Sequence, residues 1–142
     1  MMRQERDCGF YIKHINDVLQ RDANNALRSQ DLTLSQITVL LLLEGAPDGE
    51  LSLKELERRL QVAQSTAAGI IVRLEQKGFI TSYTSSEDKR IKMVRVTERG
   101  LGCCESAKQN MQRTGERLLS KLTEAERNML IKLLQKVNDG LK

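Results

Sequence analysis

Residues 52–78 read SLKELERRLQVAQSTAAGIIVRLEQKG and hold two helical patterns separated by only a few residues. Ser52 and Glu55 have the spacing of a capping box, which predicts the start of a short helix. A second helix is expected over residues 64–77, because apolar residues recur at helical spacing and Gly78 suits a left-handed helix end. The inward-facing residues of this helix are Ala67, Ile70, Ile71 and Leu74. The stretch therefore predicts a helix-turn-helix.

A β hairpin is expected directly after the second helix. Residues 79–84 and 91–97 are rich in β-branched and aromatic side chains, and the polar residues 85–90 lie between them. Two short β-prone runs around a polar turn are typical of a hairpin.

Longer helical patterns flank this region on both sides. Apolar residues at helical spacing predict helices over residues 5–29 and 98–121, the second capped by Thr97. Capping boxes that begin at Thr33 and Thr123 predict a buried, nearly all-apolar helix and a last helix near the end of the chain. The expected fold class is mainly α with a small β hairpin: a winged helix-turn-helix with about six helices.

Length and composition exclude several classes of protein. The chain has 142 residues, which fits one domain, and 39% of them are hydrophobic, enough for a packed core. No apolar run approaches the roughly 20 residues of a membrane span, and the charged start lacks the apolar segment of a signal peptide. A cytoplasmic location is therefore expected. Only 3% of residues are aromatic, which disfavours modules that stack single-stranded bases.

The positive charge is concentrated in one part of the sequence. The net charge is +4, and residues 54–95 account for all of it with nine Lys or Arg and five Asp or Glu. Such a block has the electrostatic character of a surface that binds a polyanion.

The second helix and the hairpin tip carry the side chains that duplex DNA requires. A helix fits the major groove, about 12 Å wide, and its outward residues can contact base edges. On the second helix we expect these residues to be Gln64, Ser65, Thr66, Ala68, Gly69 and Arg73. The hairpin tip is narrow enough for the minor groove, with Asp88 placed to orient Arg90. Its expected contact residues are Asp88, Lys89, Arg90 and Lys92.

The whole chain resembles the MarR family of bacterial winged-helix transcription regulators. Residues 88–100, Asp-Lys-Arg-Ile-Lys-Met-Val-Arg-Val-Thr-Glu-Arg-Gly, are similar to the family's Asp-x-Arg wing motif and the strand that follows it. Residues 73–80, Arg-Leu-Glu-Gln-Lys-Gly-Phe-Ile, are similar to the end of its recognition helix. The sequence departs from many relatives at Ala68 and Gly69, where those carry a hydroxyl residue and an arginine.

The resemblance implies a homodimer that binds a pseudo-palindromic operator in double-stranded DNA. Residues 32–97 would form the DNA-binding lobe, and residues 1–31 with 98–142 would supply the dimerisation helices. Arg90 would enter the minor groove, held by Asp88. The expected function is a transcriptional regulator, a repressor released by a small phenolic or otherwise lipophilic effector.

Two alternatives remain open at this stage. Cys8 lies near the start of the first helix, close to Arg3 and Arg6, and could make the chain a redox-sensing regulator of the same family. Alternatively, the fold could serve as a protein-interaction module that binds no DNA.

Catalytic, metal and cofactor sites are not expected. The single histidine, His14, and the absence of a Gly-rich phosphate loop leave no convincing catalytic set, so the chain is not expected to be an enzyme. No Cys-x-x-Cys spacing suggests zinc. Cys103 and Cys104 are adjacent on a predicted helix and are expected to pack in the core.

Overall fold

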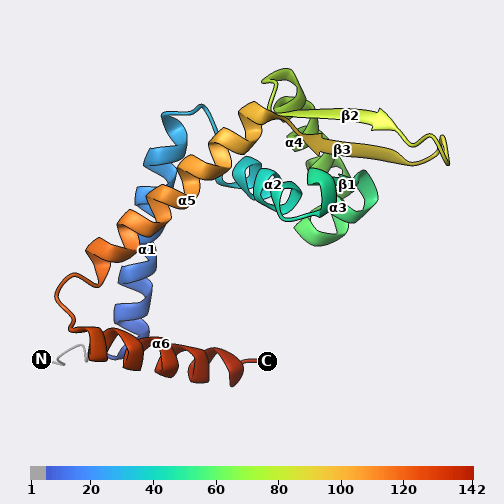
Figure 1. The fold of residues 1–142 in the computed structure, drawn as a ribbon. Helices are drawn as coiled ribbons and strands as arrows, with labels where there is room; N and C mark the ends of the chain where they lie inside the picture. Colours follow the sequence, from blue (N-terminus) through green and yellow to red (C-terminus); the bar gives the residue numbers. More distant parts are fainter. Residues whose placement is uncertain (1–5) are drawn as a thin grey trace, which may run out of the picture. The chain divides into compact units, whose positions relative to one another are not determined.

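The computed structural model describes residues 6–142, and Figure 1 shows their fold. This part of the chain forms six α-helices, a short 3₁₀ turn and three strands. In chain order they are α1 (Cys8–Arg28), α2 (Leu34–Glu44), the 3₁₀ turn (Pro47–Gly49), β1 (Glu50–Ser52), α3 (Leu53–Leu60), α4 (Gln64–Gln76), β2 (Ile80–Thr84), β3 (Lys92–Val96), α5 (Glu98–Leu118) and α6 (Glu124–Asp139). The expected fold class is confirmed. The expected start of the first helix at residue 5 lies outside the described residues, and α1 begins at Cys8.

The sheet has one strand more than the sequence predicts. Its order is β1-β3-β2 with antiparallel pairing throughout, and Arg95 of β3 lies opposite both Glu50 of β1 and Thr81 of β2. The two expected strands are present as β2 and β3. The prediction of a simple two-stranded hairpin was incomplete, because β1 is only three residues long and forms by pairing with a strand far along the sequence.

The hydrophobic core lies where α2, α3, α4 and the sheet meet. Val39, Leu40, Leu43, Leu56 and Leu74 are completely buried there. Helix α2 buries most of its surface, as its nearly all-apolar sequence predicts. Its capping box is complete. The backbone amide of Gln36 donates to Thr33 Oγ1 at 3.2 Å, and the backbone amide of Thr33 donates to the side-chain oxygen Oε1 of Gln36 at 3.1 Å.

The start of α5 is fixed against the wing by Thr97 and Gly100. The Gly100 amide donates to Thr97 Oγ1 at 3.2 Å, which confirms the predicted cap, and the same hydroxyl donates to the Gly78 carbonyl at 2.8 Å. A Cβ on Gly100 would collide with the Phe79 carbonyl oxygen and lie 2.7 Å from Val96 Cγ2. The close approach of α5 to the sheet therefore requires glycine.

The chain divides into two compact units, one ending at Asn110 and the other beginning at Met111. In the second unit, α6 starts with the predicted capping box, in which Thr123 and Glu126 bond reciprocally at 2.9 and 3.2 Å. None of the side chains of α6 is buried within the chain. No helix in residues 6–142 is long and apolar enough to cross a membrane.

Candidate nucleic-acid interface

A tight turn joins the two helices of the predicted helix-turn-helix. Helix α3 ends at Leu60, Gln61 adopts a left-handed conformation with φ of 54°, and α4 begins three residues later at Gln64. Ala67, Ile71 and Leu74 of α4 are buried, and Ile70 packs partly buried against the same core. The inward face of α4 is therefore the one that the sequence pattern predicts.

The outward face of α4 is fully accessible. All six residues expected to contact DNA on this helix are exposed: Gln64, Ser65, Thr66, Ala68, Gly69 and Arg73. No side chain caps the helix start at Ala63, so the amide groups of the first turn are open to an external acceptor. A Cβ at Gly69 would meet no atom within 4 Å, so nothing in the chain itself requires glycine there.

The end of α4 is anchored to the segment between α1 and α2. Gly78 has φ of 79°, which confirms the predicted left-handed helix end. Lys77 Nζ donates to the Asp31 carbonyl at 2.5 Å and to Gln36 Oε1 at 3.3 Å. The sequence pattern did not predict this contact.

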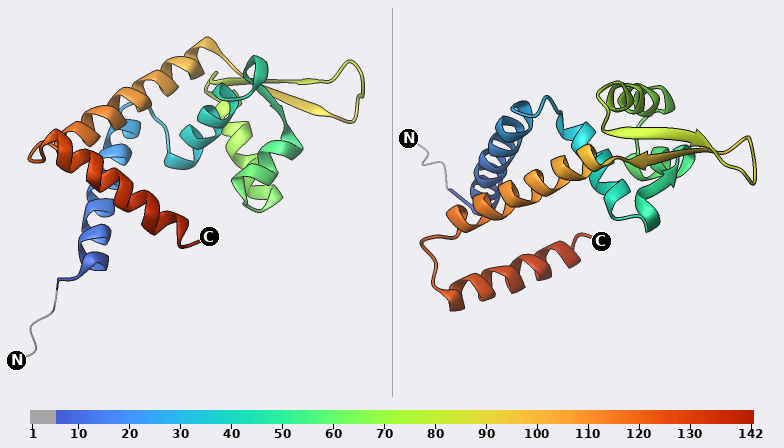
Figure 2. Two further views of the ribbon diagram at one scale, coloured as in Figure 1. Left: turned by 60° about the horizontal axis from the view of Figure 1, so that its bottom comes forward. Right: turned by 45° about the horizontal axis from the view of Figure 1, so that its top comes forward.

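The wing tip holds Arg90 in one orientation. Arg90 Nε and Nη2 donate to the Asp88 carboxylate at 3.1 and 3.2 Å, and the Arg90 amide donates to Asp88 Oδ1 at 3.0 Å. These bonds lower the pKa of Asp88, so the carboxylate remains charged at neutral pH. The Arg90 side chain is 89% exposed. Lys89 and Lys92 are exposed beside it, and Figures 1 and 2 show the β2–β3 hairpin extending beyond the helices of the lobe that carries it.

A three-strand cluster that the sequence pattern missed stabilises the base of the wing. Tyr83 of β2 donates its hydroxyl proton to Glu50 of β1, and Arg95 of β3 pairs with the same carboxylate at 3.3 Å. The Arg95 guanidinium also lies 6.0 Å from the centre of the Tyr83 ring. The cluster could be found only once β1 was known to join the sheet.

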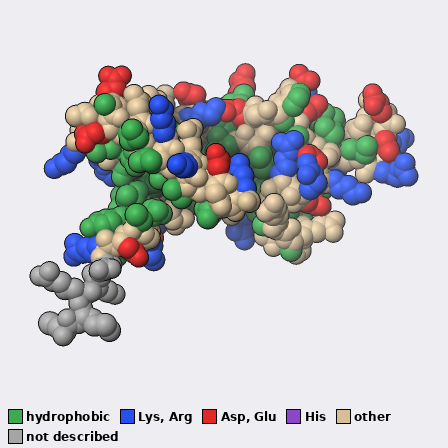
Figure 3. Space-filling model, turned by 90° about the horizontal axis from the view of Figure 1, so that it is seen from below, with side chains coloured by type: hydrophobic (Ala, Val, Ile, Leu, Met, Phe, Trp, Pro, Cys, Tyr) green, Lys and Arg blue, Asp and Glu red, His purple; other side chains and the backbone are tan. Residues whose placement is uncertain are grey.

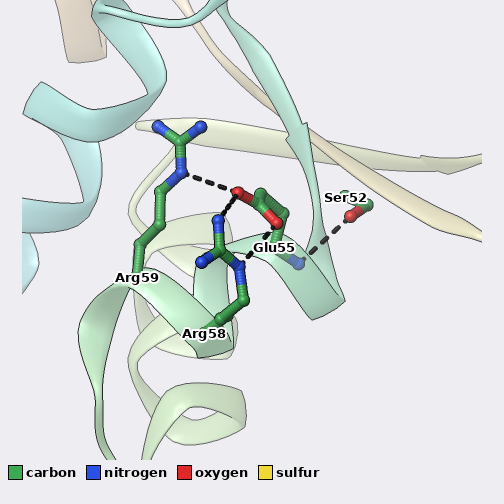
Figure 4. Close-up of polar contacts among 4 residues, drawn as sticks. All are labelled: Ser52, Glu55, Arg58 and Arg59. Carbon is green, nitrogen blue, oxygen red and sulfur yellow. Dashed lines mark hydrogen bonds and ion pairs between the residues drawn. The ribbon is translucent and has the colours of Figure 1, made fainter.

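The capping box predicted at the start of α3 is only half formed. Ser52 Oγ accepts from the Glu55 amide at 3.1 Å, as predicted. The Glu55 side chain does not return to the cap and instead binds Arg58 and Arg59, as Figure 4 shows. Two guanidinium groups attract this carboxylate more strongly than a neutral amide does.

Four basic side chains of α3, α4 and the wing have no intramolecular partner. Within residues 6–142, Lys54, Arg73, Lys89 and Lys92 make no polar contact with another side chain or with the backbone of the chain. Basic side chains elsewhere in the described part of the chain, Arg113 and Lys132 among them, also make no such contact, so the lack of a partner does not by itself mark the interface. Figure 3 shows Lys and Arg side chains gathered around the wing.

The three cysteines occupy different environments. Cys8 is exposed at the first position of α1, next to Asp7, whose carboxylate accepts from the Phe10 amide at 2.9 Å. Cys103 and Cys104 are buried, as predicted, and burial raises the pKa of the Cys104 thiol to about 11. Arg6 lies over the Phe10 ring, and Arg3 is outside the described residues.

His14 is exposed, and no group of metal-binding side chains occurs in the described part of the chain.

A helix-turn-helix followed by an antiparallel wing with a basic tip defines a winged-helix protein. The sequence profile of the MarR family matches residues 32–92. The chain is 33% identical over 116 residues to the multiple antibiotic resistance protein MarR of Salmonella typhimurium, covering 82% of this chain and 77% of that protein. This chain belongs to the MarR family. It is a DNA-binding transcriptional regulator and not an enzyme.

Two further relatives and one solved structure support membership of this family. The transcriptional repressor IacR of Pseudomonas putida is 27% identical over 139 residues, 97% of this chain and 82% of that protein. The transcriptional regulator YdgJ of Bacillus subtilis is 27% identical over 110 residues, 78% of this chain and 66% of that protein. A cysteine-to-serine mutant of E. coli MarR complexed with operator DNA superimposes with a TM-score of 0.69 at 30% identity, covering 91% of each chain.

Proposed function

We propose that this chain is a homodimeric repressor that binds a pseudo-palindromic operator. In this proposal α4 enters the major groove and the wing enters the flanking minor groove. The relative IacR is named a repressor, and the related E. coli MarR has a structure with operator DNA. Both support a role in which binding near a promoter blocks transcription.

The observation that carries the proposal is the pairing of Arg90 with Asp88 at the tip of the wing. The pair fixes the direction of a guanidinium group that is 89% exposed and has no other protein partner among the described residues. A preoriented arginine on a narrow hairpin suits the minor groove, whose negative potential attracts it. The exposed residues of α4, from Gln64 to Arg73, would read the adjacent major groove.

Exposed apolar side chains on the terminal helices support dimerisation. On α1 they are Phe10, Tyr11, Ile12 and Ile15, and on α6 they are Met129, Ile131, Leu133, Leu134 and Val137. A stable protein rarely leaves so many large apolar side chains in water, so a second copy is expected to cover them. Residues 1–31 and 98–142 would then form the dimerisation region, and residues 32–97 the DNA-binding lobe.

In this proposal a small lipophilic effector releases the protein from its operator. A dimer binds successive major grooves only when its two α4 helices are separated by roughly one helical turn of DNA, about 34–36 Å. An effector that binds a dimer with a different separation more tightly would shift the population away from the DNA-binding form.

The test is fluorescence anisotropy of the purified protein on duplex DNA from upstream of its own gene, with a scrambled duplex and a salt series in parallel. We expect tighter binding to the native fragment and a steep loss of affinity with salt. Sedimentation should show a dimer. Equal, weak binding to both duplexes would contradict the proposal and favour a protein-interaction module.

The exposure of Cys8 supports a second candidate, a regulator switched by thiol oxidation. Cys103 and Cys104 are buried and their thiol pKa values are raised, so Cys8 is the accessible thiol. Under this alternative, organic peroxide should release operator DNA from the wild-type protein but not from Cys8→Ser. Equal release from both proteins would exclude it.

A further inference from the structure

The arginines of α3 are paired in a way that adds nothing to tertiary structure. Arg58 Nε and Nη2 donate to the Glu55 carboxylate at 3.1 and 2.5 Å, and Arg59 Nε donates to Glu55 Oε1 at 2.9 Å. All three residues lie on α3 (Figure 4). Lys77 and Arg95, in contrast, connect different elements. Exposed pairs within one helix stabilise it only slightly, so the fold alone does not account for this cluster.

The cluster retains unused donors and a positive charge. Arg58 Nη1 and both terminal nitrogens of Arg59 make no hydrogen bond with the described residues. The Arg58 and Arg59 side chains are 72% and 42% exposed. The two guanidinium groups lower the pKa of Glu55 to about 2, so at neutral pH the three side chains together carry one positive charge. Guanidinium groups with free donors are the preferred partners of phosphate oxygens.

The position of the cluster relates it to the helix that enters the groove. Arg58 and Arg59 lie in the last turn of α3, directly before the turn that leads to the uncapped start of α4. In helix-turn-helix proteins the first helix crosses the DNA backbone while the second lies in the major groove. The end of α3 is therefore placed beside the phosphates that border the groove.

We propose that Arg58 and Arg59 form a phosphate-binding site for the DNA backbone and that Glu55 is the residue that orients them. The site rests on the proposed function, because its ligand is the operator duplex. It extends the interface beyond α4 and the wing to a third element. Because phosphate contacts fix the register of a protein on DNA, the site would help to place α4 over the correct base pairs.

The salt dependence of operator binding tests the site. Each homodimer would carry two copies, so Arg59→Ala should remove about two phosphate contacts and reduce the slope of log K against log salt by about 1.8. Arg58→Ala should act in the same direction. Arg113→Ala removes the same charge from an exposed position on α5, outside the proposed DNA interface. Because α5 belongs to the proposed dimerisation region, sedimentation first has to show that this variant is still a dimer, and its slope should then match that of the wild type.

Two further variants separate a phosphate contact from general effects of charge or stability. Arg59→Lys keeps the charge and the helix propensity but loses the planar fork, so it should weaken operator binding while largely retaining the slope. Glu55→Gln removes a negative charge and should strengthen binding to a scrambled duplex. If Glu55 orients the arginines, the preference for the operator should nevertheless decrease.

The outcomes distinguish this inference from the proposed function. If the wild-type protein shows no salt-dependent preference for the operator, both fail. If the wild type binds as expected and the slopes of Arg58→Ala and Arg59→Ala match that of Arg113→Ala, only the phosphate site is excluded. An unchanged operator preference in Glu55→Gln would exclude the orienting role of Glu55.

Discussion

Lys77 Nζ lies 2.5 Å from the carbonyl oxygen of Asp31, so a residue at the end of α4 is bonded to the segment that joins α1 to α2. The two residues are 46 positions apart in the sequence, and Asp31 adopts a left-handed conformation with φ of 57°. The orientation of α4 therefore depends on the segment that follows α1. This contact offers a physical connection between a proposed dimerisation helix and the proposed groove-reading helix.

Lys77→Ala should lower both stability and operator affinity. The substitution removes hydrogen bonds from a side chain that is only 27% exposed, and we expect a loss of about 1 kcal/mol in the free energy of unfolding. Chemical denaturation would measure it. Lys54→Ala, on exposed α3, removes a lysine without such a contact and should change the unfolding free energy by less than half as much. Equal effects of the two variants would show that the Asp31 contact contributes nothing.

Gly100→Ala should destabilise the winged lobe by about 1–3 kcal/mol, because the added methyl group overpacks a buried contact. The new Cβ would collide with the Phe79 carbonyl oxygen and lie 2.7 Å from Val96 Cγ2. Gly102, two residues further along α5, is the matched control, since a Cβ there meets nothing within 4 Å. Gly102→Ala should be neutral or stabilising. Thermal unfolding of the two variants would contradict this explanation if their melting temperatures were equal.

Features determined by neighbouring residues were predictable from the sequence. The capping boxes at Thr33 and Thr123 and the Asp88–Arg90 pair each involve residues two or three positions apart, and all three are present. The inward stripe of α4 was also predictable, because a helix repeats its faces at a fixed spacing.

Features that depend on distant partners were not predictable. Strand β1 has no alternation long enough to detect, and it exists because residues 93–95 pair with it. The Glu50–Tyr83–Arg95 cluster follows from this pairing, and the Lys77–Asp31 bond joins two residues 46 positions apart in the sequence. At Ser52 the local pattern was ambiguous, because Glu55 had both a cap and two arginines within reach.

Acid should remove the contribution of Glu55 to stability. The Glu55 carboxyl group has a pKa of about 2 in the folded protein, whereas its ordinary pKa is 4.5. Because folding lowers this pKa, the stabilisation is complete above the unfolded value and is lost as the pH falls from 4.5 toward 2. The difference in melting temperature between wild type and Glu55→Gln should be constant near neutral pH and shrink over that acidic range. Solvent exposure keeps the effect small. A difference that does not change with pH would show that the ion pairs do not stabilise the fold.

Arg90→Ala should weaken operator binding by on the order of tenfold, about 1.4 kcal/mol, and reduce its salt dependence. Asp88→Asn should produce a smaller loss of operator affinity, because it leaves the arginine in place but removes the negative charge and replaces the oxygen that accepts from Arg90 Nη2 with an amide nitrogen that only donates. Anisotropy titrations against the same duplex would measure both. If Asp88→Asn bound the operator more tightly than the wild type, Asp88 would act as a simple repulsive charge and not as a support for Arg90.

Gly69→Ala should separate stability from DNA recognition. Alanine is favoured over glycine in a helix interior by roughly 1 kcal/mol, and nothing in the chain obstructs a Cβ at this exposed position. The variant should therefore unfold at a higher temperature than the wild type. If the DNA approaches the α4 backbone closely at Gly69, the same methyl group should reduce operator affinity. Gly102→Ala adds a methyl group to an exposed helical position outside the proposed DNA interface. It should be neutral or stabilising and, where sedimentation shows that it is still a dimer, should bind the operator as the wild type does. Unchanged operator affinity in Gly69→Ala would mean that close backbone approach is not the reason for glycine here.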